Sequence, residues 1–294
     1  MQNAIKKISS GVDWLLVLFI LPIIAAGMVT MKSFVPIEFA SDFSGKQLIW
    51  VVISLTVFAV FSFIDFGFLK RTNVLVFIFL AVSFILLLLP VVGSISNGAR
   101  SWFDFGFFSF QPADMIKLVL VLILAKYFSR RHVEIRDTKH IFISFFYVVI
   151  PLVLVLAQPD FGSAIILFAI WLGMVLVSGI SKTHLFLVFS AGAVIFVLLW
   201  IFAFAPYQKA RITNFINPLA DIHGTGYNAF QSTIAVGSGQ VLGKGLGFGT
   251  QSRLKFLPQP QSDFIFAAFA EEWGFIGSLT VLLLYTLVIW RILY

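Results

Sequence analysis

The chain has 294 residues, of which 60% are hydrophobic and only 11% are charged, and its formal net charge is +7. Soluble domains carry about 25% charged residues, so this composition excludes a soluble globular protein and indicates a membrane protein with several spans. Continuous apolar runs favour membrane helices over the alternating pattern of a β-barrel. The positive-inside rule of membrane proteins is the first explanation to test for the net positive charge, so no nucleic acid partner is expected.

The hydropathy pattern predicts an all-α polytopic fold with eight membrane spans. They cover residues 12–31, 48–66, 74–92, 113–128, 141–157, 161–180, 185–205 and 273–293. We expect a single membrane domain over residues 1–294, with a long loop at residues 206–262 between the seventh and eighth spans. The fourth span is short, about 24 Å at 1.5 Å per residue.

Basic residues are unevenly distributed between the two sets of short loops. If the N-terminus is cytoplasmic, the inner loops hold Lys6, Lys7, Lys70, Arg71, Arg130, Arg131, Arg136, Lys139, Lys182 and Arg291. The outer loops hold fewer cations, and acidic residues offset them. The positive-inside rule therefore predicts that both termini are cytoplasmic and that the long loop is extracytoplasmic.

Three groups of polar residues fall on the predicted outer face. Arg100 follows an Asn97-Gly98 turn and is either a ligand-binding residue or an arginine that reaches the membrane interface. Asp114 and Lys117 share a helix face, where they form a structural ion pair or a wall of a substrate cavity. Asp160, after Gln158 and Pro159, is either the N-cap of the sixth span or a carboxylate that faces a polar cavity.

The long loop is basic, with five cations against Asp221, a net charge of +4. The cations are Lys209, Arg211, Lys244, Arg253 and Lys255. This charge suits lipid headgroups or an anionic ligand such as a lipid-linked pyrophosphate. The glycines of residues 237–249 do not match a phosphate-binding loop, because Ser238 and Gly245 replace the required residues. We therefore expect no nucleotide, and interpret this stretch as a pliable re-entrant or surface loop.

Asp263 ends a proline-containing segment and precedes the last apolar run. A continuous helix over residues 264–293 would be about 45 Å long, so its first turns would project beyond the membrane core. Asp263 would then lie at the outer rim, with Glu271 and Glu272 near the interface. The carboxylate is either a helix N-cap or a general base that takes a proton from a hydroxyl nucleophile.

Motifs over nearly the whole chain resemble the SEDS family of RodA and FtsW. They are NGARSWFDFG, FQPADMIKL, QPDFGSA, YQKARITNFINP, GYNAFQSTIAVGSGQVLGKGLGFGTQSRLKFLP and SDFIFAAFAEEWGFIG. The stretch GTQSRLKFLP is closer to RodA. The resemblance implies an inverting glycosyltransferase that polymerises lipid II, releases undecaprenyl pyrophosphate and works with a class B penicillin-binding protein. A lipid II transporter and a non-catalytic scaffold are the alternatives.

The resemblance also assigns roles to individual residues. Asp263 matches the essential loop carboxylate, the expected general base, and Arg100, Lys117, Asp160 and Arg211 also match family positions. With Asp114, Lys244, Lys255 and Gln261 added, these four make up the substrate-binding candidates. The family usually has Glu at the position of Asp114, and His and Thr at those of Gln261 and Ser262. It also has ten spans, so we expect the last two to be either missing from this sequence or absent in this protein.

Metal use and cellular role stay open. The sequence shows no metal-ligand spacing, but a hydrated Mg²⁺ or Mn²⁺ held by one or two carboxylates needs none. We expect the protein in the cytoplasmic membrane with its active site facing outward. The sequence does not distinguish a role in cell elongation, and hence cell shape, from one in division.

Overall fold

A computed structural model describes residues 12–33, 37–96, 99–106, 108–129, 138–179, 181–202, 204–217, 221, 224 and 226–294. The predicted inner-loop cations Lys6, Lys7, Arg130, Arg131 and Arg136 lie outside these residues, as does the Asn97-Gly98 turn. The described chain divides into two compact units. One comprises residues 1–64 and 200–294, and the other comprises residues 65–199.

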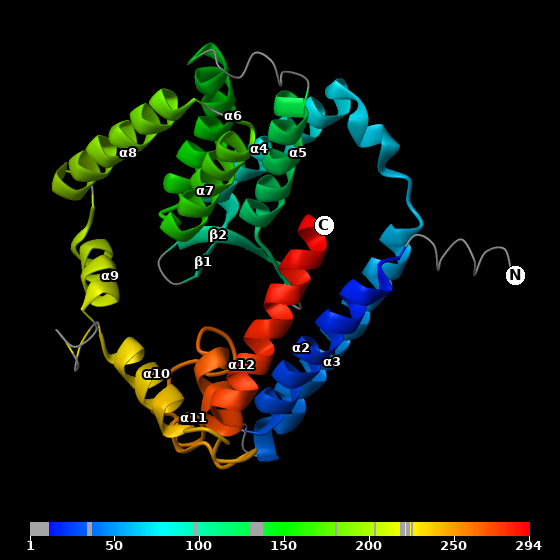
Figure 1. The fold of residues 1–294 in the computed structure, drawn as a ribbon, viewed down its shortest axis with the longest axis vertical. Helices are drawn as coiled ribbons and strands as arrows, with labels where there is room; N and C mark the ends of the chain where they lie inside the picture. Colours follow the sequence, from blue (N-terminus) through cyan, green and yellow to red (C-terminus); the bar gives the residue numbers. More distant parts are fainter. Residues whose placement is uncertain are drawn as a thin grey trace, which may run out of the picture. The chain divides into compact units, whose positions relative to one another are not determined.

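All eight predicted spans coincide with helices (Figure 1). These are α2 (Trp14–Ser33), α3 (Ile37–Ser62), α4 (Thr72–Val92), α5 (Pro112–Ser129), α6 (Thr138–Leu156), α7 (Phe161–Val177), α8 (Lys182–Phe202) and α12 (Ile265–Leu293). Six of the described helices are long and apolar enough to cross a membrane. The other two predicted spans are α5, which carries Asp114, Lys117 and Lys126, and α7, which has 17 residues. The all-α membrane fold is confirmed, and the span count and the orientation stay predictions.

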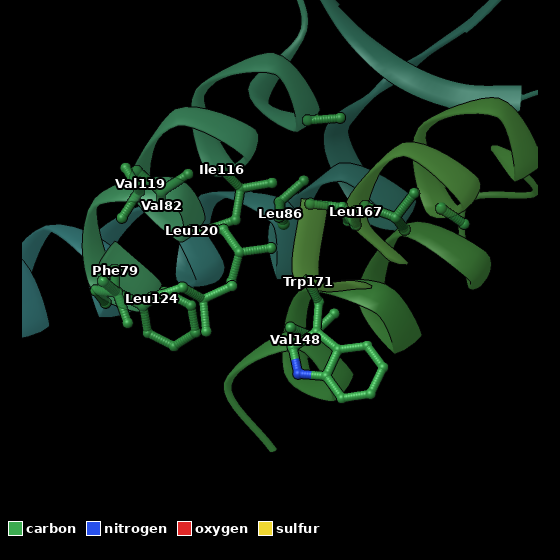
Figure 2. Close-up of a cluster of buried hydrophobic side chains, with 14 of the residues drawn as sticks. Phe79, Val82, Leu86, Ile116, Val119, Leu120, Leu124, Val148, Leu167 and Trp171 are labelled. Carbon is green, nitrogen blue, oxygen red and sulfur yellow. The ribbon is translucent and has the colours of Figure 1, made fainter. Parts of the chain in front are cut away.

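The unit of residues 65–199 packs α4, α5, α6 and α7 around one apolar core (Figure 2). Leu75, Phe79, Val82 and Leu86 recur on α4 at helical spacing and face Ile116, Leu120 and Leu124 of α5, together with residues of α6 and α7. The polar atom of the buried Trp171 is satisfied, because its Nε1 donates to the Ser144 hydroxyl at 3.0 Å. Close packing of this kind associates helices in a membrane, where lipid removes most of the hydrophobic driving force.

Three short strands follow α4, in a region where the sequence predicted only a turn. They are β1 (Ser94–Ser96), β2 (Ala99–Asp104) and β3 (Ser109–Phe110), and they form an antiparallel sheet in the order β1-β2-β3. Ser96 pairs with Ala99, and Phe103 pairs with Phe110. β2 contacts both α4 and α5, so the sheet covers one end of this helix group.

The other unit pairs the first described helix with the last. α12 packs along α2, and α3 packs on α2. Arg291 Nε donates to Asp13 Oδ2 at 2.7 Å at one end of the pair, and Trp273 Nε1 donates to the Thr30 hydroxyl at 3.2 Å nearer the other. Residues distant in sequence thus fix the register of these two helices.

The long loop of residues 206–262 contains helical structure that the sequence did not predict. It includes α9 (Pro206–Ile216), α10 (Tyr227–Ser238) and the short α11 (Thr250–Arg253). α10 and α11 both pack on α12. The expectation of a continuous helix over residues 264–293 is wrong, because α12 is broken at Gly274.

Candidate functional site

The break in α12 is completed by the backbone of the glycine-rich loop. Gly274 has φ 68° and ψ −165°, a conformation essentially restricted to glycine. The N–H groups of Lys244 and Gly245 donate to the carbonyls of Glu271 and Glu272, each at 3.0 Å. Buried backbone groups need hydrogen-bond partners, and the loop supplies those that the broken helix lacks.

On the C-terminal side of the break, the helix donates and the loop accepts. The N–H of Phe275 donates to the Gln240 carbonyl at 2.8 Å, and the N–H of Ile276 donates to the Val241 carbonyl at 3.2 Å. A Cβ on Gly243 would lie 2.1 Å from the Glu272 carbonyl oxygen, so only glycine permits this approach. The loop is thus paired with α12 on both sides of its break, and its description as a pliable re-entrant or surface loop stays a prediction.

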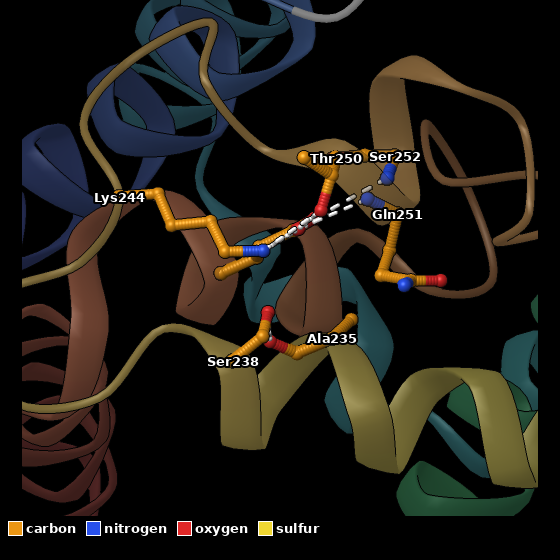
Figure 3. Close-up of polar contacts among 7 residues, drawn as sticks. Ala235, Ser238, Lys244, Thr250, Gln251 and Ser252 are labelled. Atoms are coloured by element: carbon orange, nitrogen blue, oxygen red, sulfur yellow. Dashed lines mark hydrogen bonds and ion pairs between the residues drawn. The ribbon is translucent and has the colours of Figure 1, made fainter.

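Glu271 is the centre of the polar contacts between the loop and α12, and its side chain is fully buried. Its Oε1 accepts from Lys244 Nζ at 2.9 Å, from the Thr250 hydroxyl at 3.2 Å and from the Gln251 N–H at 2.9 Å. Its Oε2 accepts from the Ser252 N–H at 3.2 Å and from the Ser252 hydroxyl at 2.9 Å. Figure 3 shows Lys244, Thr250 and the Gln251 and Ser252 backbone arranged around this contact.

Glu272 makes a second contact, between the loop and α2. Its Oε1 accepts from the Ser33 hydroxyl at the end of α2 and from the Gly247 N–H, the latter at 2.9 Å. The residue is 2% exposed, and its Oε2 has no hydrogen-bond partner among the described residues. Sequence reasoning assigned no role to Glu271 or Glu272. The available signal was two adjacent acids beside an apolar run, which is costly in a membrane helix unless they are paired.

Asp263 lies in the turn before α12, and its side chain is exposed. The N-cap position belongs to Phe264 and forms no side-chain cap, so the expected N-cap role of Asp263 is not observed. The segment before it is anchored by Leu257, which is 1% exposed and packs with Ala267 and Ala268 of α12. Asp263 is thus a solvent-accessible carboxylate on an anchored segment.

The other predicted residues of this unit differ in their surroundings. Arg211 on α9 is exposed, Lys255 after α11 is exposed, and Gln261 is half-buried. Lys244 is half-buried, and its ammonium already donates to both Glu271 and the Thr250 hydroxyl. The expectation that these residues contact substrate stays a prediction, and for Lys244 it would require the ion pair to break.

The remaining predicted residues belong to the unit of residues 65–199. Asp160 Oδ1 accepts from the Ser163 N–H at 3.0 Å and so caps α7, and its Oδ2 accepts from Gln111 Nε2 at 3.0 Å. Asp114 and Lys117 form an ion pair at 2.8 Å, with 65% of the Asp114 side chain exposed. Arg100 donates to the Pro90 carbonyl at 3.0 Å. The structural roles are therefore visible, and their contacts with substrate stay predictions.

An apolar cavity of about 430 Å³ lies between α6, α7 and α8 in the same unit. Its walls include Phe142, Phe168, Trp171 and Leu187, and His184 supplies a polar edge. Nothing in the sequence located this cavity, because it depends on how three apolar helices pack. Within the described residues, no three His, Cys, Asp or Glu side chains are grouped to hold a metal ion, so the question of Mg²⁺ or Mn²⁺ stays open.

Comparison with known proteins now places these features in a family. The profile described as "Cell cycle protein", for FtsW, RodA and SpoVE, matches residues 12–294. The chain belongs to the FtsW, RodA and SpoVE family. The predicted resemblance to the SEDS proteins is thereby confirmed, and the chain is a multi-pass membrane protein of that family.

Relatives in this family come from several bacteria. The chain is 36% identical over 251 residues to the probable peptidoglycan glycosyltransferase FtsW of Haemophilus influenzae, covering 85% of this chain and 62% of that protein. It is 37% identical over 215 residues to the peptidoglycan glycosyltransferase MrdB of Escherichia coli K12, covering 73% and 58%. For the stage V sporulation protein E of Bacillus subtilis the identity is 34% over 288 residues, covering 95% and 77%. The chain thus spans less than two thirds of the first two relatives, and these similar identities leave the closer likeness to RodA a prediction.

Solved structures share the fold. A chain from a study of how a peptidoglycan synthase complex coordinates polymerization and crosslinking aligns with a TM-score of 0.74 at 28% identity, covering 95% of this chain and 76% of that chain. The crystal structure of the rod shape determining protein RodA of Thermus thermophilus aligns with a TM-score of 0.64 at 26% identity, covering 95% and 73%.

Proposed function

We propose that this protein is a peptidoglycan glycosyltransferase that polymerises lipid II into glycan strands. The observation that carries the proposal is the match over residues 12–294 to a family whose relatives include named peptidoglycan glycosyltransferases. The carboxylate of Asp263 also supports the proposal, because it is exposed, does not cap α12 and lies on a segment anchored to that helix.

Asp263 serves as the general base in this proposal. Its carboxylate takes the proton from the sugar 4-hydroxyl of an acceptor lipid II, and that oxygen attacks the anomeric carbon of the growing glycan. The new carbon–oxygen bond forms as the bond from the anomeric carbon to the phosphate oxygen breaks. The electron pair leaves with undecaprenyl pyrophosphate, and the configuration at the anomeric carbon inverts. A positioned general base typically contributes a factor of about 10² to 10⁴.

The leaving pyrophosphate needs positive charge, and the loop beside Asp263 offers it. Arg253 and Lys255 are exposed at and just after α11, and Arg211 is exposed on α9. Arginine suits phosphate because its guanidinium donates two parallel hydrogen bonds. Direct contacts from Arg100, Asp114, Lys117, Asp160 and Gln261 are further parts of this proposal.

A long isoprenoid chain also needs an apolar site. The cavity of about 430 Å³ between α6, α7 and α8 has the size of a typical ligand pocket and an almost wholly apolar wall. We propose that this cavity binds an apolar lipid chain.

A lipid II transporter is the rival function, and the break in α12 is the observation that favours it. Discontinuous helices line the substrate path in many transporters. Here, however, the broken backbone is paired with residues 240–245, and the acids beside it bind the protein's own donors. A break filled in this way supports a fixed site better than an open path.

A class B penicillin-binding protein is the proposed partner, and the outer face of the cytoplasmic membrane is the proposed place of the reaction. The similarity to a chain studied within a peptidoglycan synthase complex supports a partner of this kind. The predicted orientation, with residues 206–262 and Asp263 outside, supports the location.

The test is to supply lipid II to the purified protein in lipid vesicles, with and without the partner, and to measure both glycan formation and lipid II movement across the bilayer. We expect glycan, with undecaprenyl pyrophosphate released in step. Movement of lipid II without glycan in both conditions would establish the transporter instead. Repeating the assay with a chelator, and then with added Mg²⁺ or Mn²⁺, decides whether a divalent cation takes part.

A further inference from the structure

Among the residues that the structure describes, every hydrogen-bond partner of the buried Glu271 carboxylate lies in the loop of residues 206–262, and none lies on its own helix. The donors come from Lys244 and from residues 250–252, which are 19 to 27 residues away in sequence. Its two oxygens accept five hydrogen bonds, and a single cation balances its charge. A carboxylate used in this way holds two segments together, because each donor it binds belongs to the segment opposite.

The clamped segment leads directly to Asp263. α11 begins at Thr250, and after it the N–H of Leu257 donates to the Gln251 carbonyl at 3.0 Å. Leu257 is buried against Ala267 and Ala268. The segment that leads to Asp263 is therefore attached to the first turns of α12 at two places. Leu257 packs on Ala267 and Ala268, and residues 250–252 bind Glu271.

We propose that Glu271 is a positioning residue that fixes the Asp263 carboxylate without touching substrate. The effect on catalysis rests on the proposed function. The attachment of the loop to α12 through Glu271 rests on the hydrogen bonds alone.

Glutamine cannot substitute for Glu271, although its shape is nearly the same. A glutamine side chain has one acceptor oxygen, and its NH₂ group is a donor. The NH₂ group would face either the donors of Ser252 or those of Lys244 and Gln251, and the Lys244 ammonium would lose its counter-charge. Removing one partner of a buried ion pair leaves the other charge uncompensated. Glu271→Gln and Glu271→Ala should therefore release the loop to a similar degree.

The absence of cysteine from the chain permits a direct measurement of loop position. Spin labels on Ser262→Cys and Leu282→Cys report the distance from the Asp263 segment to α12. Labels on Leu18→Cys and Leu282→Cys report the packing of α2 on α12 and serve as the fold control. Ser262, Leu282 and Leu18 are all exposed, so the labels need no space inside the protein.

The variants are Glu271→Ala, Glu271→Gln and the milder Thr250→Val, which removes one neutral donor from Glu271 and serves if the first two fail to fold. Thr286→Val is the matched control, because the Thr286 hydroxyl bonds only to the Leu282 carbonyl of its own helix and is exposed. We expect the 262–282 distance distribution to broaden in the Glu271 variants, while the 18–282 distribution stays narrow.

Lipid II polymerisation by the unlabelled variants provides the second readout. A displacement of about 1 Å at a reacting group can cost about 100-fold in rate, and we expect a loss of that order in kcat for Glu271→Ala. Because Glu271 acts through Asp263, adding Glu271→Ala to Asp263→Asn should cause no further loss. A purely structural role would multiply the two losses.

Two results would overturn the inference: an unchanged 262–282 distance in the Glu271 variants, or losses that multiply in the double variant. Failure of the proposed function gives a different pattern. In that case the wild type makes no glycan, while the 262–282 distance still broadens when Glu271 is replaced.

Discussion

Asp160 shows how a single side chain combines a structural and a proposed chemical role. Its two oxygens bind the Ser163 N–H and the Gln111 amide. Asparagine keeps an acceptor for the N–H group and is an equally good N-cap residue, whereas alanine keeps none. The two substitutions therefore separate stabilisation of α7 from a contact with substrate.

Asp160→Ala should lower the free energy of unfolding by about 1 kcal/mol, since a lost N-cap costs that amount. Asp160→Asn should retain the wild-type unfolding temperature in thermal denaturation and still lose polymerisation activity. Equal activity of Asp160→Asn and the wild type would remove Asp160 from the list of substrate-binding residues.

Lys244 marks the limit of what charge alone predicts. The sequence presents it as one of five loop cations, but the folded chain gives its ammonium to a buried carboxylate 27 residues later. No local pattern signals that pairing. Asp263 could be singled out because the family resemblance and its place before an apolar run agree, and its exposure in the structure fits that role.

At the scale of elements, apolar runs of about twenty residues predicted eight spans, because membrane helices need that length, and each predicted span coincides with a helix. The break in α12 could not be found this way. A single glycine within an apolar run does not reveal that its φ is positive. It also does not reveal that the N–H groups of the next two residues bind the carbonyls of Gln240 and Val241. The sheet after α4 was missed for a related reason, since its strands have only two to six residues.

Gly274→Ala should be among the most destabilising small substitutions in this chain. The residue has φ 68°, and an added Cβ would lie 2.2 Å from the Gly243 nitrogen. Strain in this backbone region costs roughly 1–3 kcal/mol before the clash is counted. Thermal unfolding in detergent should show a clear loss of Tm.

Gly173→Ala is the matched control for that measurement. Gly173 lies within α7, and a Cβ there meets no atom within 4 Å. Alanine favours a helix over glycine by up to about 1 kcal/mol, so this variant should be neutral or slightly more stable. Equal losses in the two variants would contradict the role assigned to the break.

At the scale of the whole molecule, the positive-inside rule predicts which ends of the helices face the cell exterior. Cysteine introduced at Ser262 should react with a membrane-impermeant maleimide on intact cells, and cysteine at Lys182 should react only after the cells are opened. Both positions are exposed, and the chain has no other cysteine to label. The reverse pattern would place Asp263 in the cytoplasm and contradict the proposed location.

The central claim is that Asp263 is the base of a lipid II polymerisation reaction, and the rate of glycan formation by Asp263→Asn tests it most directly. The control is Asp65→Asn, which changes another exposed carboxylate that caps the short helix at Phe66–Lys70. We predict a loss of about 100-fold or more for Asp263→Asn, with unchanged lipid II binding, and wild-type activity for Asp65→Asn. Glycan formation by Asp263→Asn at the wild-type rate would contradict the account.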